Sequence, residues 1–286
     1  MRILVTGGAG FLGSHLCESL VDRGDHVTCF DNLTSGSINN IAHLEGPNFE
    51  LTKVINAGER FDQIYHLASP AAPAMIQKYP DMTEYVNHGG TRILLNNVAS
   101  NKFLFVSTVK VHGDCERVQP YITGKRGGES ICLARGLKVA RLANSYGPRM
   151  ALDDSRVIPT FIRRALLGEP LSLWNGGEQT DSFCYVSDVI RGLIAFMDSK
   201  EKGVIEFGAK EGIKIKDLAA LITGLCGGDP VPFLTESIPV SDDCHQLANL
   251  TRAKTLLGWE PYISITKGLT LTIECVRDRL GNRRAA

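Results

Sequence analysis

The sequence of 286 residues lacks the features that mark a membrane, secreted or nucleic-acid-binding protein. No apolar run approaches the roughly 20 residues that a membrane-spanning helix needs. The 31 basic residues are balanced by 31 acidic ones, so no overall field favours nucleic acid or an anionic membrane. The chain starts directly with an expected strand, MRILVTG, and we therefore expect no signal peptide. These absences favour a cytoplasmic protein with a small-molecule substrate.

The eight cysteines are scattered, without C-x-x-C spacing or a cluster of histidine and cysteine. This pattern argues against a zinc site, and we expect no metal ion. In a chain of this size without a secretion signal, we also expect reduced cysteines rather than disulfides.

Short β-branched stretches alternate with longer amphipathic ones as far as Gly208. The strands are expected at 3–6, 26–30, 63–68, 103–107, 138–143, 183–186 and 204–208. The helices are expected at 10–24, 83–99, 123–136 and 157–168, and further on at 215–226, 251–258 and 265–280. This alternation predicts an α/β fold with a doubly wound parallel sheet covered on both faces.

A glycine-rich turn, TGGAGFLGSH, follows the first expected strand. Gly7, Gly10 and Gly13 have G-x-x-G-x-x-G spacing at a strand-to-helix turn, where the backbone can approach a pyrophosphate and the helix start supplies amide donors. Asp31 follows the second strand, 18 residues after Gly13. A carboxylate there accepts both adenosine ribose hydroxyls and repels the 2′-phosphate of NADP. The sequence therefore predicts that the chain binds NAD.

Tyr121 and Lys125 form a Y-x-x-x-K pattern in an expected helix. Residues four apart share one helical face, so the ammonium is expected to lie beside the phenol. A neighbouring cation stabilises phenolate, and we expect the pKa of Tyr121 to fall toward neutrality, so that it can take and return a hydroxyl proton. Thr108 or Ser107, at the end of the strand FLFVS, is placed to bind the same substrate oxygen.

With these motifs the chain resembles the extended short-chain dehydrogenase/reductase family, which includes NAD-dependent nucleotide-sugar epimerases, dehydratases and decarboxylases. The likeness extends to DNLTSG, HLASPAAP, VNHGGT, NSYGPRM, GEQTDSFCYVSDV and LLGWEP. The sequences HLASPAAP, GPRM and SFCYVSD are most similar to the corresponding motifs of the UDP-glucuronate decarboxylases. The resemblance implies that Tyr121 deprotonates a sugar 4-hydroxyl while hydride passes to NAD. The 4-keto sugar then epimerises, loses water or loses carbon dioxide, and is reduced again.

The resemblance also implies roles for residues that match the family motifs. The implied NAD contacts, besides the glycines and Asp31, are Phe11, Leu12, Asn32, Leu67, Ala68, Ser69, Tyr121 and Lys125. The implied substrate contacts are Lys110, Asn144, Arg149, Trp174 and Asp181. Among these, Trp174 matches an aromatic residue that packs on uracil, but it is equally consistent with an ordinary core aromatic. Asn144 is also consistent with a turn residue.

The chain departs from the family where the substrate chemistry is decided. In place of the family's Ser-Glu or Asp-Glu pair after the catalytic threonine stand Val109 and Lys110. Dehydration needs a carboxylic acid/base pair, and these residues supply none. Decarboxylation is affected less, because a β-keto acid loses carbon dioxide readily, and Lys110 is either a carboxylate contact or a solvated lysine. Of the three reactions, 4-epimerisation depends least on the side chains at positions 109 and 110.

Two further departures affect the nucleotide-sugar site. Asp181 stands where the family has an arginine that grips the diphosphate, and 241–249, SDDCHQLAN, replaces an arginine-rich stretch. A carboxylate repels phosphate, so the usual diphosphate clamp is expected to be lost. FELTKVIN, at 49–56, lacks the acidic residue that often follows the third strand and holds the adenine.

The link from Gly113 to Tyr121 has only seven intervening residues, which is shorter than usual in the family. Its shortness is expected to leave the site more open, or closed by a partner subunit. By analogy, residues 1–146 plus 182–208 form the NAD-binding domain and 147–181 plus 209–286 the substrate lobe, in a homodimer. Two alternatives stay open, an enzyme for a cationic amino sugar or aminocyclitol and a catalytically weak NAD-binding sensor or scaffold. An activated Tyr–Lys pair speaks against the latter.

Overall fold

A parallel sheet forms the centre of the computed structural model, which describes residues 1–227, 232–236 and 247–285, with side chains as far as Gly281. The sheet has seven strands in the order β11-β6-β5-β4-β1-β2-β3. Its strands are β1 (Arg2–Thr6), β2 (His26–Phe30), β3 (Phe49–Thr52), β4 (Arg60–His66), β5 (Ala99–Thr108), β6 (Lys138–Leu142) and β11 (Gly203–Phe207). The strand order reverses direction next to β1, and in such sheets ligands bind at the carboxyl ends of the strands beside that point. The predicted α/β fold is confirmed.

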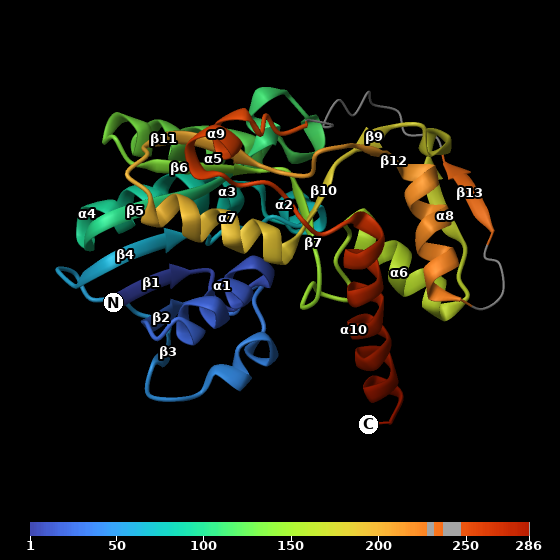
Figure 1. Ribbon diagram of the computed structural model, residues 1–286, viewed down its shortest axis with the longest axis horizontal. Coiled ribbons are helices and arrows are strands. Elements are labelled where there is room, and N and C mark those ends of the chain that lie inside the picture. The colour runs from blue at the N-terminus through green and yellow to red at the C-terminus, as the bar shows by residue number, and fades with distance from the viewer. Residues whose placement is uncertain (228–231, 237–246, 286) are drawn as a thin grey trace.

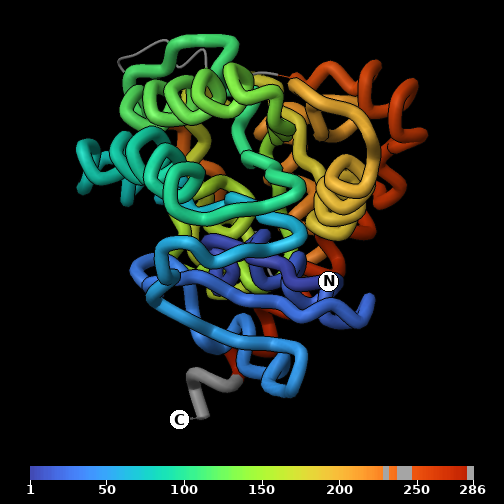
Figure 2. Tube along the Cα trace, turned by 90° about the vertical axis from the view of Figure 1, so that its left-hand side faces the viewer, coloured from blue at the N-terminus to red at the C-terminus, as the bar shows by residue number. Residues whose placement is uncertain are grey.

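Helices cover both faces of the sheet (Figures 1 and 2). On one face lie α1 (Phe11–Asp22) and α7 (Val186–Asp198), which contact each other. The other face is covered by α3 (Pro80–Tyr85), α4 (Thr91–Asn97) and α5 (Gln119–Ala134), with the short helix α2 (Pro73–Lys78) beside them. A π-helical turn, Val86–Gly90, joins α3 to α4, so the expected helix at 83–99 is locally widened rather than regular.

A smaller group of elements lies on the right in Figure 1, beyond the carboxyl ends of the strands. It contains α6 (Val157–Leu167), α8 (Ile215–Cys226), α10 (Ile265–Ala285) and three short two-stranded ladders. The ladders are β7 (Asn144–Tyr146) with β10 (Phe183–Tyr185), β8 (Leu171–Trp174) with β13 (Phe233–Glu236), and β9 (Thr180–Asp181) with β12 (Ile213–Lys214). The chain thus leaves the sheet after β6 and returns to it at β11.

The helix α9 (Thr251–Leu257) packs back onto the edge strand β11. Behind it the buried Trp259 lies edge-on to Phe207, with 5.0 Å between ring centroids, and its Nε1 donates to Asp188 O at 3.0 Å. The division into 1–146 plus 182–208 and 147–181 plus 209–286 stays a proposal, and this contact favours moving α9 to the sheet-bearing part.

Cys115 takes part in a disulfide, so the expectation of reduced cysteines is wrong for this residue. The other described cysteines are free thiols. Within the described ranges, no helix is both long and apolar enough to cross a membrane. The same ranges contain no group of three or more side chains suited to holding a metal ion.

Candidate active site

The glycine-rich turn between β1 and α1 is shaped by close backbone contacts. Gly7 has φ +72°, and a Cβ at Gly13 would lie 2.0 Å from Gly7 O, so only glycine lets the helix start this close to the turn. Gly10 caps α1 without a side chain. The first N–H groups of a helix have no intrahelical partners and carry the positive end of its dipole, which suits a diphosphate bound at Phe11, Leu12 and Gly13.

Asp31 is held at the end of β2 by the same turn. Its Oδ2 accepts from Ala9 N at 3.0 Å and its Oδ1 from Leu33 N at 2.8 Å, which fixes the carboxylate where a ribose is expected. Next to it, Asn32 Oδ1 accepts from Thr34 N and stabilises the following turn.

The segment after β4 forms the opposite side of this turn. Leu67 packs against the core, and Ala68 N donates to Thr6 Oγ1 at 3.2 Å. Ser69 Oγ is buried and has no hydrogen-bond partner in the described part of the chain. A buried hydroxyl without a partner costs free energy unless a ligand engages it. These residues and the glycine-rich turn fit a dinucleotide such as NAD.

Thr108, Tyr121 and Lys125 lie together where β5 ends and α5 begins. Lys125 is almost fully buried, and its Nζ donates to Val106 O at 2.6 Å and lies 5.7 Å from the centre of the Tyr121 ring. Tyr121 hydrogen-bonds the Thr108 side chain. The buried Ser107 Oγ has no partner within the described ranges. The geometry gathers the expected trio, and its catalytic role stays a prediction.

The pKa of Tyr121 differs from the sequence-based expectation. Burial raises it to about 12, although the hydrogen bond from Thr108 and the charge of Arg156 both act to lower it. Burial also lowers the pKa of Lys125 to about 7, against the attraction of Glu129. We expected the charge of Lys125, one helical turn away, to bring the pKa of Tyr121 toward neutrality. The desolvation of both side chains has the larger effect, so that expectation is wrong for the protein chain alone.

Arg156 is a site residue that the sequence did not reveal. It precedes α6, and its Nε donates to both carboxylate oxygens of Asp154, at 2.9 and 3.0 Å. The guanidinium carbon lies 5.9 Å from the centre of the Phe11 ring. Its charge acts on Tyr121 across about 35 residues of sequence, so no local motif connects the two.

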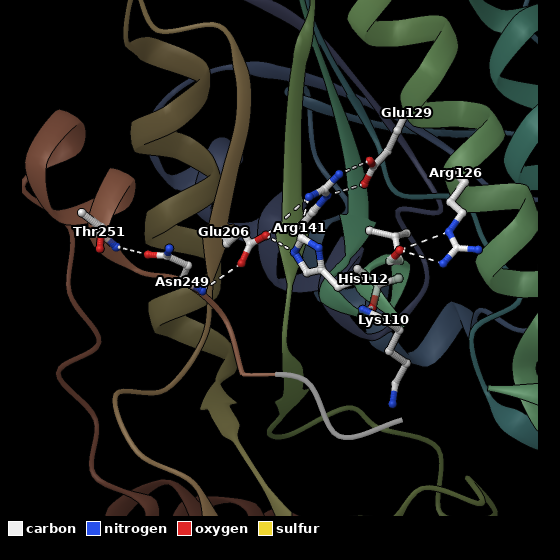
Figure 3. A network of polar contacts seen from close by, with 10 residues as sticks. Lys110, His112, Arg126, Glu129, Arg141, Glu206, Asn249 and Thr251 are labelled. Carbon is white, nitrogen blue, oxygen red and sulfur yellow. Dashed lines mark hydrogen bonds and ion pairs between the residues drawn. The ribbon is translucent and has the colours of Figure 1, made fainter. Parts of the chain in front are cut away.

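A polar network supports the turn that follows Thr108 (Figure 3). In this turn, Val109–His112, His112 Nε2 lies 2.5 Å from Glu206 Oε1 on β11. Arg141 on β6 lies 3.5 Å from the same oxygen and donates to both carboxylate oxygens of the buried Glu129 on α5, at 2.8 and 2.6 Å. The network thus joins α5, the strands β6 and β11, and the turn.

Val109 and Lys110 differ in their surroundings. Val109 is buried in the core, whereas Lys110 is half-buried and its N donates to Thr108 Oγ1 at 3.3 Å. Figure 3 shows the Lys110 side chain extending away from the network. Val109 is therefore part of the buried core, and a substrate contact by Lys110 stays a prediction.

Asp181 and Asn144, two expected substrate contacts, bind each other. Asn144 Nδ2 donates to Asp181 Oδ1 at 2.6 Å, and Ser182 N donates to the same oxygen at 3.0 Å. Trp174 ends β8 and lies under the guanidinium of Arg117, whose carbon is 4.1 Å from the ring centre. The expected loss of a second clamp in 241–249 falls largely outside the described residues.

Arg149, also an expected substrate contact, turns toward α1. Its Nη2 donates to Glu18 Oε2 at 2.8 Å and lies 3.3 Å from His43 Nε2. It has φ +69°, which is uncommon for a residue with a side chain. These contacts lie on the nucleotide-binding side of the fold, so the structure does not bring Arg149 to the Asn144–Asp181 pair.

The short link before Tyr121 packs against its own chain. Its 3₁₀ turn, Glu116–Val118, buries Val118 and Cys115 against Ile76 of α2 and Ile122 of α5, with Tyr121 packed on this cluster. The helix α2 therefore covers the link, an arrangement that the sequence did not predict.

Comparison with known proteins places these features in context. The model of the NAD dependent epimerase/dehydratase family matches residues 3–208. The chain is 39% identical to UDP-glucuronic acid decarboxylase 1 of Xenopus tropicalis, covering 98% of this chain and 73% of that protein. It is 37% identical to UDP-glucuronic acid decarboxylase 6 of Arabidopsis thaliana, covering 98% of this chain and 90% of that protein.

Two solved structures have the same fold over almost the whole chain. UDP-glucose 4-epimerase from Thermotoga maritima, crystallised with UDP-glucose, is 31% identical with a TM-score of 0.86, covering 98% of this chain and 100% of that one. UDP-glucuronic acid 4-epimerase from Bacillus cereus, crystallised with UDP-glucuronic acid and NAD, is 27% identical with a TM-score of 0.87 and the same coverage.

Proposed function

The chain belongs to the NAD-dependent epimerase/dehydratase family, and from this we propose that it oxidises the C4 hydroxyl of a nucleotide-linked sugar to a transient 4-keto intermediate. The membership confirms the family, fold and NAD dependence expected from the sequence. The observation that carries the proposal is the Thr108–Tyr121–Lys125 group, with Lys125 Nζ fixed by Val106 O beside the phenol.

The chemistry follows from the positions of these side chains. When bound, NAD would accept the hydride, and its oxidised nicotinamide would add positive charge to the site. Tyr121 takes the C4 hydroxyl proton as the C4 hydrogen leaves with its electron pair, and the C=O bond forms. Thr108 orients the same oxygen by hydrogen bonding. When the sugar is reduced again, Tyr121 returns the proton, so the overall reaction is redox-neutral.

Two outcomes of the 4-keto stage are consistent with the site. The curated relatives named above are UDP-glucuronic acid decarboxylases, and the solved neighbours named above are 4-epimerases. Decarboxylation of a 4-keto uronic acid depends less on a carboxylic acid/base pair than dehydration does, and we propose that Lys110 contacts the sugar carboxylate. Epimerisation needs only that the keto sugar rotate within the site, so that hydride returns to the opposite face of C4. Val109 and Lys110 supply no pair for dehydration.

A second candidate substrate is a cationic amino sugar or aminocyclitol. The buried carboxylate of Asp181 favours a cation over a phosphate, although Asn144 and Ser182 N already engage it. The third candidate, an NAD-binding sensor or scaffold, has no use for the buried Tyr121–Lys125 pair.

Product analysis tests these candidates. The NAD-loaded protein is incubated separately with UDP-glucuronate and UDP-glucose, and the products are identified by mass spectrometry and NMR. A UDP-pentose with carbon dioxide indicates decarboxylation, and a C4 diastereomer of unchanged mass indicates epimerisation. If NAD raises the melting temperature but neither sugar binds or reacts, the nucleotide-sugar proposal is wrong.

We also propose a homodimer that forms through α3, α4 and α5. Tyr85 on α3, Ile93 on α4 and Leu133 on α5 are exposed, with accessible fractions of 59%, 51% and 39%. Exposed apolar side chains on these three helices favour burial against a second copy. The cytoplasmic location expected from the sequence stays a prediction.

A further inference from the structure

The turn that follows Thr108, Val109–His112, is held at both of its ends. At its start Thr108 caps the turn, because its Oγ1 accepts a hydrogen bond from Lys110 N at 3.3 Å. At its end His112 Nε2 lies 2.5 Å from Oε1 of Glu206 on the edge strand β11 (Figure 3). The turn therefore connects a carboxylate of the sheet edge to the hydroxyl of Thr108.

Glu206 is itself held from two further sides. Its side chain is almost fully buried, and its Oε2 accepts from Asn249 N at 2.8 Å. Nη1 of Arg141 lies 3.5 Å from its Oε1, and the same guanidinium donates to both carboxylate oxygens of Glu129 on α5. Since the carboxylate has partners on several elements, it is a rigid anchor for the side chain of His112.

The contact with Glu206 also determines which nitrogen of His112 carries a proton. An ionised carboxylate accepts hydrogen bonds and donates none, so the bond of 2.5 Å requires a proton on Nε2. This contact is the shorter of the two that the nitrogen makes, since Arg141 Nη1 lies 3.4 Å away. The neutral Nε2–H tautomer and the imidazolium both donate from Nε2, so the bond exists in either protonation state.

The hydrogen bond from Lys110 N determines how Thr108 uses its hydroxyl. A threonine hydroxyl has one proton and two acceptor positions, and Lys110 N occupies one of the acceptor positions. Burial raises the pKa of Tyr121, and the hydrogen bond with Thr108 opposes this rise, as a bond donated to the phenolate does. Thr108 is therefore oriented as a donor toward Tyr121 and the oxygen on which Tyr121 acts.

We propose that His112, bound to Glu206, is a positioning residue that keeps the Thr108 hydroxyl directed at Tyr121 and at the reacting oxygen of the substrate. It acts through the turn and not by contact with the reacting atoms. The inference rests on the proposed function, because it takes Thr108 to orient the C4 oxygen of the sugar. It gives β11, which lies at the edge of the sheet, a part in the chemistry.

The surroundings of His112 allow it to be replaced without loss of the fold. Its side chain is 43% accessible, whereas Val109 and Val111 are buried and attach the turn to the core. A replacement of His112 is therefore expected to alter the hydrogen bonding of the turn and to leave the turn in place.

Two amides of different length test the positioning role, by steady-state kinetics of the NAD-loaded protein with UDP-glucuronate and UDP-glucose. His112→Gln carries an N–H about as far from the backbone as Nε2 of the ring, and we expect kcat within about threefold of the wild type. His112→Asn is one methylene shorter and does not reach Glu206, and we expect kcat to fall about tenfold. Its KM should stay within about twofold, because a bond that strengthens in the transition state acts on kcat.

The matched control is His26→Asn, which replaces an exposed histidine at the amino end of β2 and should leave kcat unchanged. Calorimetric affinity for NAD and urea denaturation, measured on each variant, report on the fold. A merely structural His112 predicts that His112→Asn lowers the unfolding free energy and leaves kcat unchanged.

That result would overturn the inference and leave the proposed function intact. The inference is also wrong if the Gln and Asn variants lose kcat equally, or if His112→Asn changes KM alone. A wild-type protein that binds NAD and converts neither sugar would overturn both the inference and the proposed function.

Discussion

Burial raises the pKa of Tyr121 to about 12 and lowers that of Lys125 to about 7, so burial disfavours both the phenolate and the ammonium. A unit charge about 6 Å away contributes about 3 kcal/mol at an effective dielectric constant of about 20. This corresponds to about two pKa units. Protonated Lys125, Arg156 and an oxidised nicotinamide together offset the desolvation of the phenolate. The site therefore gains its base only when these charges are assembled.

Replacing Tyr121 by Phe removes the proton acceptor and leaves the ring in place. We expect turnover to fall by about 10²- to 10⁴-fold, which is the usual contribution of a positioned acid/base group. The affinity for NAD, measured by calorimetry, should stay the same. Turnover that is retained would remove Tyr121 from the mechanism.

Glu129 tunes the charge of Lys125, which lies one helical turn before it. Lys125 is protonated below its pKa of about 7, and the stabilisation of phenolate is lost as pH rises through that pKa. Glu129→Gln removes the attraction that raises the pKa, so the alkaline limb of the activity profile should move to lower pH. The profile of kcat against pH measures this shift.

The control for this prediction is Glu84→Gln, which alters an exposed carboxylate on α3, beside α5. Its pH profile should match that of the wild type. An unmoved limb in Glu129→Gln, or one that moves to higher pH, would contradict the role given to Glu129.

At the scale of elements, the ion pair between Glu129 and Arg141 ties α5, which carries Tyr121 and Lys125, to the sheet. The pair joins α5 to β6, and the contacts of Arg141 and His112 with Glu206 extend it to β11 and to the turn after Thr108 (Figure 3). Asn249 N also donates to Glu206 Oε2 at 2.8 Å, so the segment that leads into α9 is part of the same arrangement.

Arg141→Ala leaves the carboxylate of Glu129 buried without its partner. Breaking a buried ion pair in this way typically costs about 3–5 kcal/mol, and we expect a loss of unfolding free energy in this range. Urea denaturation measures it. The control is Arg92→Ala at an exposed position, which should change the stability by no more than about 0.5 kcal/mol. Equal losses of unfolding free energy in the two variants would show that the Glu129–Arg141 ion pair does not stabilise the fold.

The sequence predicted the elements with strong local periodicity and missed those that depend on distant partners. The bounds of β2 and α8 agree with their expected ranges, because alternation and helical spacing are complete within them. The turns 109–112 and 116–118 were not predicted, because packing across the fold shapes them. His112 and Glu206 lie 94 residues apart in the sequence, and no local sequence pattern predicts their contact.

The candidate site follows the same division. The glycine-rich turn and the Tyr121–Lys125 spacing were predictable, since each is local. The Asn144–Asp181 bond, the Arg117–Trp174 stacking and the turn of Arg149 toward Glu18 were not. The predicted substrate contacts thus depend on residues far apart in the sequence, which explains why the sequence identified the redox chemistry more clearly than the sugar.

At the scale of the whole molecule, the exposed apolar face of α3, α4 and α5 predicts a dimer. Ile93→Asp places a charge on α4 in that face, and we expect the protein to become monomeric because burying an unpaired charge is costly. Size-exclusion chromatography with light scattering measures the mass. Leu271→Asp, at a partly exposed apolar position on α10, is the control and should leave the dimer intact. A wild-type protein that is already monomeric would contradict this prediction.

The central claim is that hydride leaves C4 of a nucleotide sugar and returns to the same carbon. UDP-glucuronate and UDP-glucose labelled with deuterium at C4 test it most directly, with the products analysed by NMR and mass spectrometry in ordinary water. We predict that the product, whether a pentose or a C4 diastereomer, retains the deuterium at C4. A product in which solvent hydrogen has replaced that label would contradict the account, because the C4 hydrogen would then have left as a proton.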